Sequence, residues 1–362
     1  MRRLVKIIGM SLLVIIGNIF AITNAEDSTN REDQIAWNPI STEFTRVQSG
    51  DWINSDVFAV GRWDGTLTVF RMPHEGEYTP VLLGTLSTSK GDGVEMLLAT
   101  FDGYLIYSDT ISQLGVWNVR EKSKPALFPY AENLGTANSA LVFSDNDESM
   151  LVTGHANGFI ALWRYDSGNL SFVRAIDLRS DNPINSPYPL KNIRGLAHWK
   201  NNLIITGSED GDISVVNINN DQVIFRTRYN ATAQRGINNI SVIADNLLLA
   251  NCSVGSDDYN LWLYKLSDRG IELKDSINLI KDTSRHQSFN FDADLFEDTG
   301  VLRFLASTEE GILWAGRVED STLVVEKTAS VASDGGALID VAPSNKRILA
   351  AARKIYIFGM WR

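Results

Sequence analysis

Cysteine and histidine are scarce in this chain, and their scarcity excludes several kinds of site. Cys252 is the one cysteine in 362 residues, so no internal disulfide and no cysteine-rich metal cluster can form. The histidines, His74, His155, His198 and His286, show no i, i+4 ligand spacing. The chain also lacks a P-loop, a dinucleotide-binding glycine motif and a G-x-S-x-G nucleophile turn. We therefore expect no metal, no cofactor and no catalytic residue that the sequence can identify.

Basic residues are outnumbered by acidic ones. The 33 Lys and Arg against 44 Asp and Glu give a formal net charge of −11. Such a surface repels phosphate backbones, which argues against nucleic acid as a partner. It favours a protein partner with a basic surface. We expect the isolated protein to be a monomer.

A long apolar run occurs only at the N-terminus. Three basic residues within the first six positions precede the mostly apolar stretch Ile7–Ile22, and Thr23 and Ala25 stand at −3 and −1 of a cleavage site. This is the layout of a secretory signal peptide, and the run is shorter than the ~20 residues that span a bilayer. We predict a signal peptide over residues 1–25, then a short flexible segment over 26–34. The mature protein would be secreted or periplasmic, without stable membrane insertion. An uncleaved anchor is the alternative.

No amphipathic helix pattern follows the signal segment; a repeated hairpin does. In each copy an apolar strand meets a short turn, commonly Asp-Gly or Asn-Gly, and a second apolar strand with an aromatic residue follows. Asp-Gly and Asn-Gly supply the positive φ that a tight two-residue turn requires. The copies include VFAVGRWDGTLTVFRM from Val57, MLLATFDGYLIYS from Met96 and MLVTGHANGFIALWRY from Met150. The sequence therefore predicts an all-β fold.

The spacing of the turns predicts the architecture. Successive turn markers lie roughly 40–55 residues apart, the length of a four-stranded propeller blade. The markers are Asp64, Asp102, Asn157, Asp210, Asp258, Glu310 and Arg353. We predict one β-propeller over residues 35–362, with seven four-stranded blades. The C-terminal blade has three strands of its own, and IAWNPIST at Ile35–Thr42 can supply the fourth and close the ring.

Two hairpins, VTGHANGFIALWRY and ITGSEDGDISVVNI, resemble those of WD-repeat β-propellers. The resemblance covers residues 35–362 in degenerate form. The Trp-Asp ending of the family is absent, since Asn118 follows Trp117 and Arg164 follows Trp163. With strands lettered a to d from the axis outward, the resemblance implies that b–c turns and d–a loops share one face. It also implies that turn acids brace hydrogen-bond networks.

The acidic and amide residues of the turns have an expected structural role. Side chains of Asp and Asn in tight turns bond local backbone groups, so we assign a structural role to Asp64, Asp102, Asn157, Asp210 and Glu310. The alternative for the acids is Ca²⁺ binding or acid–base work at the axis.

Aromatic and acidic residues beside the turns are candidates for partner binding. Trp63 lies within its turn, where an exposed indole suits a protein-binding hot spot. The proposed partner-binding set is Trp63, Tyr104, His155, Phe159, Glu209, Tyr259 and Glu309.

Three classes of function remain open, of which the third is a purely structural part of an envelope assembly that differs from the first mainly in the permanence of its complex. The first is an exported protein–protein interaction scaffold that uses the b–c turn and d–a loop face. The second, by analogy with exported propellers, is an enzyme or enzyme subunit with its site at the mouth of the central channel. Exported propellers of that second class include lactonases, glycan-acting enzymes and subunits of dehydrogenases.

Overall fold

A computed structural model describes most of the chain after residue 36. The described ranges are 37–40, 47–72, 80–88, 93–108, 112–121, 123–145, 148–179, 191–228, 236–243, 246–252, 260–279, 292–307, 312–330, 336–341, 347–352 and 355–359. These ranges fall in one compact unit, Ala36–Met360. The expected signal peptide and the segment 26–34 lie outside the described residues.

The described residues are mostly in β-strands and the turns between them, and the 3-10 turn η1 spans Glu132–Leu134. No described helix is long and apolar enough to cross a membrane. The strands group into seven antiparallel four-stranded sheets, here numbered 1 to 7. Sheet 1 contains β2 (Val47–Trp52), β3 (Val57–Arg62), β4 (Thr66–Arg71) and β5 (Val81–Ser87); sheet 2 contains β6 (Leu97–Ala99), β7 (Tyr104–Ser108), β8 (Gln113–Asn118) and β9 (Ala126–Pro129); sheet 3 contains β10 (Ala137–Asp145), β11 (Glu148–His155), β12 (Phe159–Asp166) and β13 (Asn169–Asp177).

The remaining sheets follow the same order along the chain. Sheet 4 contains β14 (Ile193–Lys200), β15 (Leu203–Ser208), β16 (Asp212–Asn217) and β17 (Gln222–Arg228); sheet 5 contains β18 (Ile237–Ile243), β19 (Leu247–Cys252), β20 (Leu261–Ser267) and β21 (Gly270–Ile277); sheet 6 contains β22 (Asp292–Asp298), β23 (Val301–Ser307), β24 (Ile312–Glu319) and β25 (Thr322–Ser330). Sheet 7 contains β26 (Gly336–Val341), β27 (Arg347–Ala352), β28 (Ile355–Gly359) and β1 (Trp37–Ile40). The predicted all-β fold built from four-stranded sheets is confirmed.

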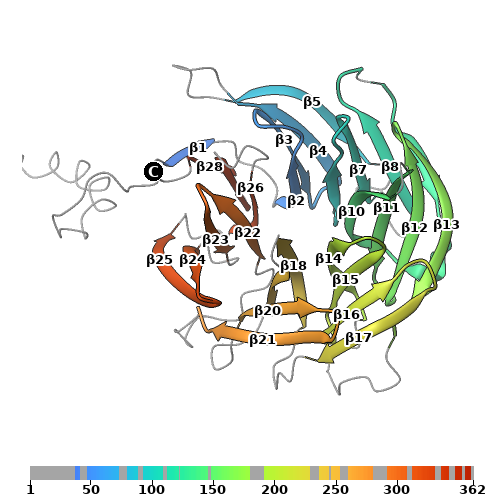
Figure 1. The fold of residues 1–362 in the computed structure, drawn as a ribbon. Helices are drawn as coiled ribbons and strands as arrows, with labels where there is room; N and C mark the ends of the chain where they lie inside the picture. The colour runs from blue at the N-terminus through green and yellow to red at the C-terminus, as the bar shows by residue number, and fades with distance from the viewer. Residues whose placement is uncertain are drawn as a thin grey trace, which may run out of the picture. The chain divides into compact units, whose positions relative to one another are not determined.

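Neighbouring sheets contact one another through their first strands. Each of β2, β6, β10, β14, β18, β22 and β26 contacts the next in this order, and β26 contacts β2. Figure 1 shows these strands toward the middle of the unit and the fourth strands outside. Strand β1 pairs with β28, with Trp37 opposite Phe358. The four strands of a sheet are therefore lettered a to d from the middle outward.

The apolar core lies between the sheets. One cluster joins sheets 2 and 3 through Ile106, Leu114, Leu151 and Trp163, and comparable clusters lie between other neighbouring sheets. Another cluster joins sheet 1 to Leu349 and Ile355 of sheet 7. Strands rich in Val, Ile, Leu and aromatic residues bury both faces of sheets 1 to 5 in this way.

Hydrogen bonds between sheets recur at one position near the start of strand a. A register shift there separates the first and third residues, as in Val47/Ser49, Ala137/Ser139 and Ile237/Asn239. The third residue then bonds the next sheet or the chain entering it. Ser49 Oγ donates to the Val94 carbonyl (2.7 Å), Ser139 Oγ to that of Ile193 (2.8 Å), and Asn239 Nδ2 to that of Ala293 (3.1 Å).

The hairpin that begins at Met96 does not occupy the position in its sheet that was predicted for it. The turn Thr100–Tyr104 lies between β6 and β7, so it joins strands a and b, whereas the turns at Asp64, Asn157 and Asp210 join strands b and c. The Ala99 amide, at the end of β6, donates to Asp51 near the end of β2 (2.7 Å), which orients the two strands alike. The Asp102 turn therefore lies at the opposite end of the sheets from the Asp64 turn.

We predict that Ser241→Ala lowers the free energy of unfolding by roughly 1–3 kcal/mol, because it removes two hydrogen bonds between sheets 5 and 6. Ser241 Oγ donates to Asp294 Oδ1 (2.6 Å) and accepts from the Leu295 amide (3.1 Å). Burial raises the pKa of the Asp294 carboxyl, and the Ser241 bond opposes that rise. Urea unfolding measures the loss. Ser171→Ala, on the exposed part of β13, is the control; equal effects would contradict the role of Ser241.

Candidate functional site

The b–c turns of sheets 1, 3 and 4 form one end of the sheets, which we call the turn face. Their first residues are Arg62, His155 and Ser208, and their fourth residues are glycines. The carbonyl of the first residue accepts a hydrogen bond from the glycine amide, at 3.1, 3.2 and 2.9 Å. In these turns the glycine alone has positive φ, +74° at Gly65 and +91° at Gly211.

This geometry corrects the expected turn type. The Asp-Gly and Asn-Gly connections are not two-residue turns with two positive φ values; they are longer turns that end in a left-handed glycine. Turns with positive φ at both central residues occur at the other end of the sheets. Ser167–Gly168 (+46°, +85°) and Asp320–Ser321 (+50°, +65°) are examples.

The Asp and Asn side chains of the turn face bond their own surroundings. Asp64 Oδ1 accepts from the Thr66 amide (3.0 Å), and Asp210 accepts from the Ser208 hydroxyl. Asn157 Nδ2 donates to the Asn133 carbonyl of the preceding d–a loop (2.9 Å). These are the contacts that a structural role requires. Glu310 lies outside the described residues.

The Asp102 turn uses the same contacts at the opposite end of the sheets. Thr100 Oγ1 donates to Asp102 and accepts from the Tyr104 amide (3.0 Å), and the Tyr165 hydroxyl of sheet 3 donates to Asp102 Oδ1. Burial, reinforced by the bond to Asp102, raises the pKa of Tyr165 well above its usual value. Tyr104 packs on Gly168, where an added Cβ would lie 2.3 Å from its ring. Tyr104 therefore does not share a surface with Trp63, contrary to the prediction.

His155 is buried and is not part of an exposed surface. Its side chain is fully covered, and its ring packs edge-on against Tyr130, with the centroids 4.8 Å apart. Nδ1 lies 2.9 Å from the Gly135 carbonyl and so donates to it, which leaves Nε2 to accept from the Thr153 hydroxyl (2.9 Å). Trp163 Nε1 donates to the same hydroxyl (3.1 Å). This chain of bonds needs a neutral ring, and burial lowers the pKa of His155 to about 4.

Glu209 and Phe159 are on the turn-face side but are engaged with neighbours. Glu209 pairs with Arg194, and 11% of its side chain is exposed. Phe159 is partly buried against the core of sheets 2 and 3, and the Arg179 guanidinium lies 4.9 Å from its ring centroid. Tyr259 and Glu309 lie outside the described residues.

Trp63 is the exposed aromatic residue of the described b–c turns. Half of its surface is exposed. The turn that carries it is held by the bonds of Asp64 and by Arg62, whose Nη2 donates to Thr68 Oγ1 (2.8 Å). A large apolar side chain on such a braced turn loses little conformational freedom when a partner binds.

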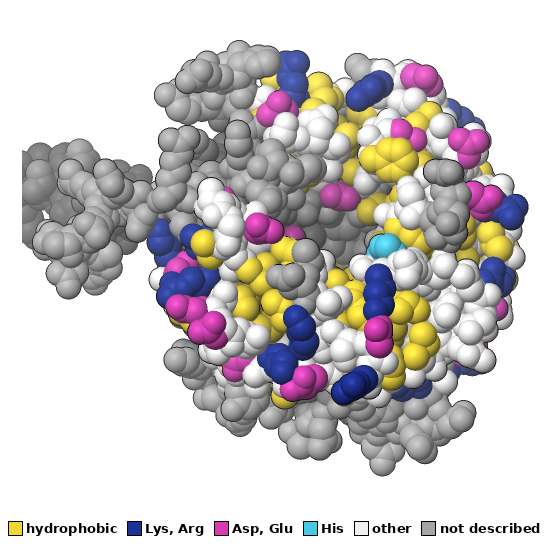
Figure 2. Space-filling view, in the orientation of Figure 1, with side chains coloured by type: hydrophobic (Ala, Val, Ile, Leu, Met, Phe, Trp, Pro, Cys, Tyr) yellow, Lys and Arg dark blue, Asp and Glu magenta, His cyan; other side chains and the backbone are white. Residues whose placement is uncertain are grey.

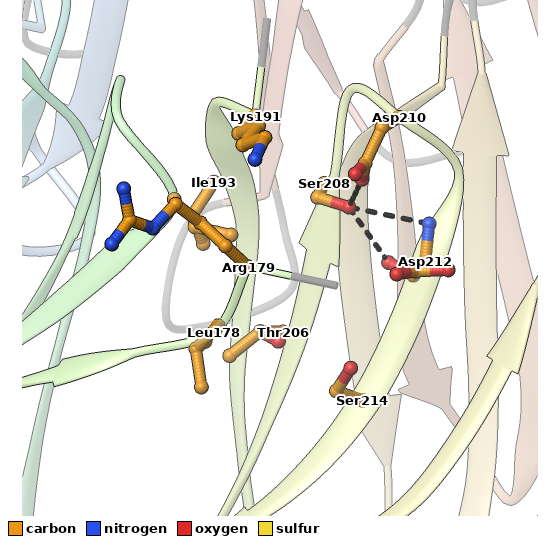
Figure 3. A pocket seen from close by; sticks show the side chains of 10 residues that line it. Leu178, Arg179, Lys191, Ile193, Thr206, Ser208, Asp210, Asp212 and Ser214 are labelled. Carbon is orange, nitrogen blue, oxygen red and sulfur yellow. Dashed lines mark hydrogen bonds between the residues drawn. The ribbon is translucent and has the colours of Figure 1, made fainter. Parts of the chain in front are cut away.

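A small pocket opens between sheets 3 and 4 beside the Asp210 turn (Figure 3). Its polar lining combines the cations Arg179 and Lys191 with Asp210, Asp212 and several hydroxyls. Arg226 lies 3.6 Å from Asp212 and donates to the Leu178 carbonyl (2.9 Å), so it links the two sheets. On the face seen in Figure 2, cationic and anionic side chains likewise lie next to one another. Across the residues that the structure describes, no three His, Cys, Asp or Glu side chains are grouped to hold a metal ion.

The role of the first residue of these turns was not predicted from the sequence. Thr100 and Ser208 each stand two positions before the turn aspartate, and their hydroxyls bond both that carboxylate and the backbone two residues beyond it. A recurring Ser/Thr-x-Asp-Gly pattern was the available signal. Phe101, with 76% of its surface exposed, was also missed as a candidate; it lies in the Asp102 turn, away from the turn face.

We predict that His155 makes stability depend on pH between about 4 and 6.5. The folded state keeps the ring neutral, whereas the unfolded chain takes up a proton near pH 6.5. The contribution of the neutral ring to the free energy of unfolding is therefore fully present above pH 6.5. It is lost as the pH falls toward 4, by up to roughly 3 kcal/mol. His155→Gln removes this slope at the expense of stability at neutral pH. Urea unfolding at several pH values measures it, and an unchanged slope in the variant would contradict the assignment.

Comparisons with known proteins place the fold. No model of a protein family matches the sequence, and no curated protein is detectably similar to it. Among solved structures, the chain is similar to the β-propeller domain of Cps50 (Swd1) from Myceliophteria thermophila, with a TM-score of 0.66 and 14% sequence identity. The similarity covers 90% of this chain and 100% of that one. The chain therefore has a β-propeller fold that resembles WD-repeat propellers.

Proposed function

We propose that this protein is an exported interaction scaffold that binds a protein partner through its turn face. The observation that carries the proposal is Trp63, an exposed indole on a turn held by side-chain and backbone hydrogen bonds. Exposed aromatic side chains in rigid settings supply much of the affinity at protein interfaces. The fold agrees with this function, since WD-repeat-like propellers commonly mediate protein interactions, but a fold alone does not determine function.

The finer features of the proposal rest on separate arguments. We infer that the seven sheets are the blades of one closed propeller over residues 35–362. The pairing of β1 with β28, the contact of β26 with β2 and the cluster joining sheets 7 and 1 support this inference. The basic and apolar layout of residues 1–25 supports export to the periplasm or outside the cell, and the net charge of −11 favours a partner with a basic surface.

We predict that Trp63→Ala weakens partner binding roughly tenfold or more, as truncation of a hot-spot aromatic does. The mature protein would be used as bait in its native compartment, and the captured proteins would be quantified by mass spectrometry. Phe101→Ala, an equally simple truncation at the opposite end of the sheets, is the matched control and should retain the partner.

Two results would contradict the proposal. Loss of the partner in the Phe101 variant but not in the Trp63 variant would show that the partner binds at the end of the sheets opposite the turn face. A retained stoichiometric metal or small molecule with no protein partner would favour the enzyme hypothesis.

A further inference from the structure

The chain contains one Asn-Gly pair, Asn157–Gly158, and this pair lies in the b–c turn of sheet 3. Asn-Gly is the dipeptide most prone to spontaneous deamidation, because glycine has no side chain to hinder attack of its backbone nitrogen on the asparagine side chain. Asn157 is also exposed to water, which the reaction consumes. The turn therefore combines a reactive sequence with access to solvent.

Deamidation would replace the amide of Asn157 by a carboxylate. The Gly158 nitrogen loses its proton and bonds to Asn157 Cγ, and the side-chain nitrogen leaves as ammonia. Water then opens the resulting cyclic imide. Opening at Cγ gives aspartate, whereas opening at the backbone carbonyl gives isoaspartate, whose main chain is one carbon longer. Either product adds a negative charge and removes a hydrogen-bond donor.

Hydrogen bonds hold the turn in a form that opposes this reaction. Asn157 Nδ2 donates to the Asn133 carbonyl (2.9 Å), which turns the side chain toward the d–a loop that precedes sheet 3. The Gly158 amide donates to the His155 carbonyl (3.2 Å), so the proton that the reaction removes is already bonded. Both bonds have to break before the two reacting atoms can meet.

The d–a loop is attached to the turn at further points. The Ala156 amide donates to the Thr136 carbonyl (2.9 Å), and the Asn157 amide donates to the Leu134 carbonyl (3.1 Å). The Asn157 side chain also packs on Gly135, where an added Cβ would lie 3.1 Å from Nδ2. The loop and the turn must therefore separate before the Asn157 side chain can bend back onto its own main chain.

We propose that Asn157 is a deamidation site at which the reaction waits for the turn to open, and that the product breaks the contact between the turn and the d–a loop. Local opening of a folded protein has its own equilibrium, and a reaction confined to the open form is slowed by that factor. After the reaction a carboxylate faces the Asn133 carbonyl, which accepted a hydrogen bond from the amide. Two acceptors repel each other, so the modified turn stays apart from the loop.

Peptide mass spectrometry of the mature protein, incubated at mildly alkaline pH in buffer and in urea, tests the rate. In urea, Asn157 should deamidate faster than any other asparagine. In buffer its rate should fall roughly tenfold or more, because the closed turn does not react. Equal rates in buffer and urea, or a faster asparagine elsewhere in urea, would overturn the proposal.

Leu134→Ala tests whether the contact with the loop restrains the reaction. Leu134 is buried in the core of sheets 2 and 3, with 3% of its surface exposed, and so anchors the loop. Its truncation should accelerate deamidation of Asn157 in buffer roughly threefold or more. Leu323→Ala in sheet 6 is the matched control, since it removes the same atoms from a side chain with 5% exposed. Equal acceleration in both variants would assign the reaction to global unfolding and overturn the proposal.

Asn157→Asp tests the effect of the product, because it creates one of the two product side chains directly. It should lower the urea concentration at the midpoint of unfolding. Asn219→Asp, in the exposed c–d turn of sheet 4, makes the same change of charge. Among the described residues the Asn219 side chain forms no hydrogen bond with another loop, so this control should unfold as the wild type does. Equal midpoints for the two variants would contradict the proposed loss of contact.

Discussion

The structure depends on burying the apolar faces of four-stranded sheets without help from helices, which the described residues do not supply beyond short 3-10 segments. Each sheet must therefore pack against a neighbour on both sides, and the apolar clusters lie between sheets rather than within one central core. Hydrogen bonds from the start of strand a to the next sheet add a polar, geometrically specific connection. The packing uses up the sheet faces, so the strand ends and the outer strands are what remain for binding.

The turns at those ends are rigid because their polar groups are satisfied locally. A hydroxyl, a carboxylate and a left-handed glycine form the same arrangement at Ser208–Asp212, on the turn face, and at Thr100–Tyr104, at the opposite end. His155 replaces the hydroxyl in sheet 3 and passes the bonding through Thr153 to Trp163 in the core. Turn chemistry is thus a local property, and it is independent of the end of the sheet at which the turn lies.

Because turn chemistry is local, the sequence predicted the strands and turns but not the position of every turn within its sheet. Strand composition and turn residues are local, so the all-β fold and the four-stranded sheets were predictable. The position of the second hairpin within its sheet was not predictable, because Thr100–Tyr104 has the residues of the b–c turns but joins strands a and b. The burial of His155 was missed for a related reason. Its cover comes from Tyr130 and Gly135, a d–a loop some twenty residues away, and hydropathy near His155 does not report that contact.

Charge and apolar exposure have separate consequences on this surface. The charged residues described near the turn face are largely paired already, as Glu209 is with Arg194 and Asp177 with Arg179, so a partner that binds them must replace existing ion pairs. Such charges contribute mainly to the rate and selectivity of association. In the proposed function, affinity comes from an apolar side chain held in place before binding, Trp63 at the turn face.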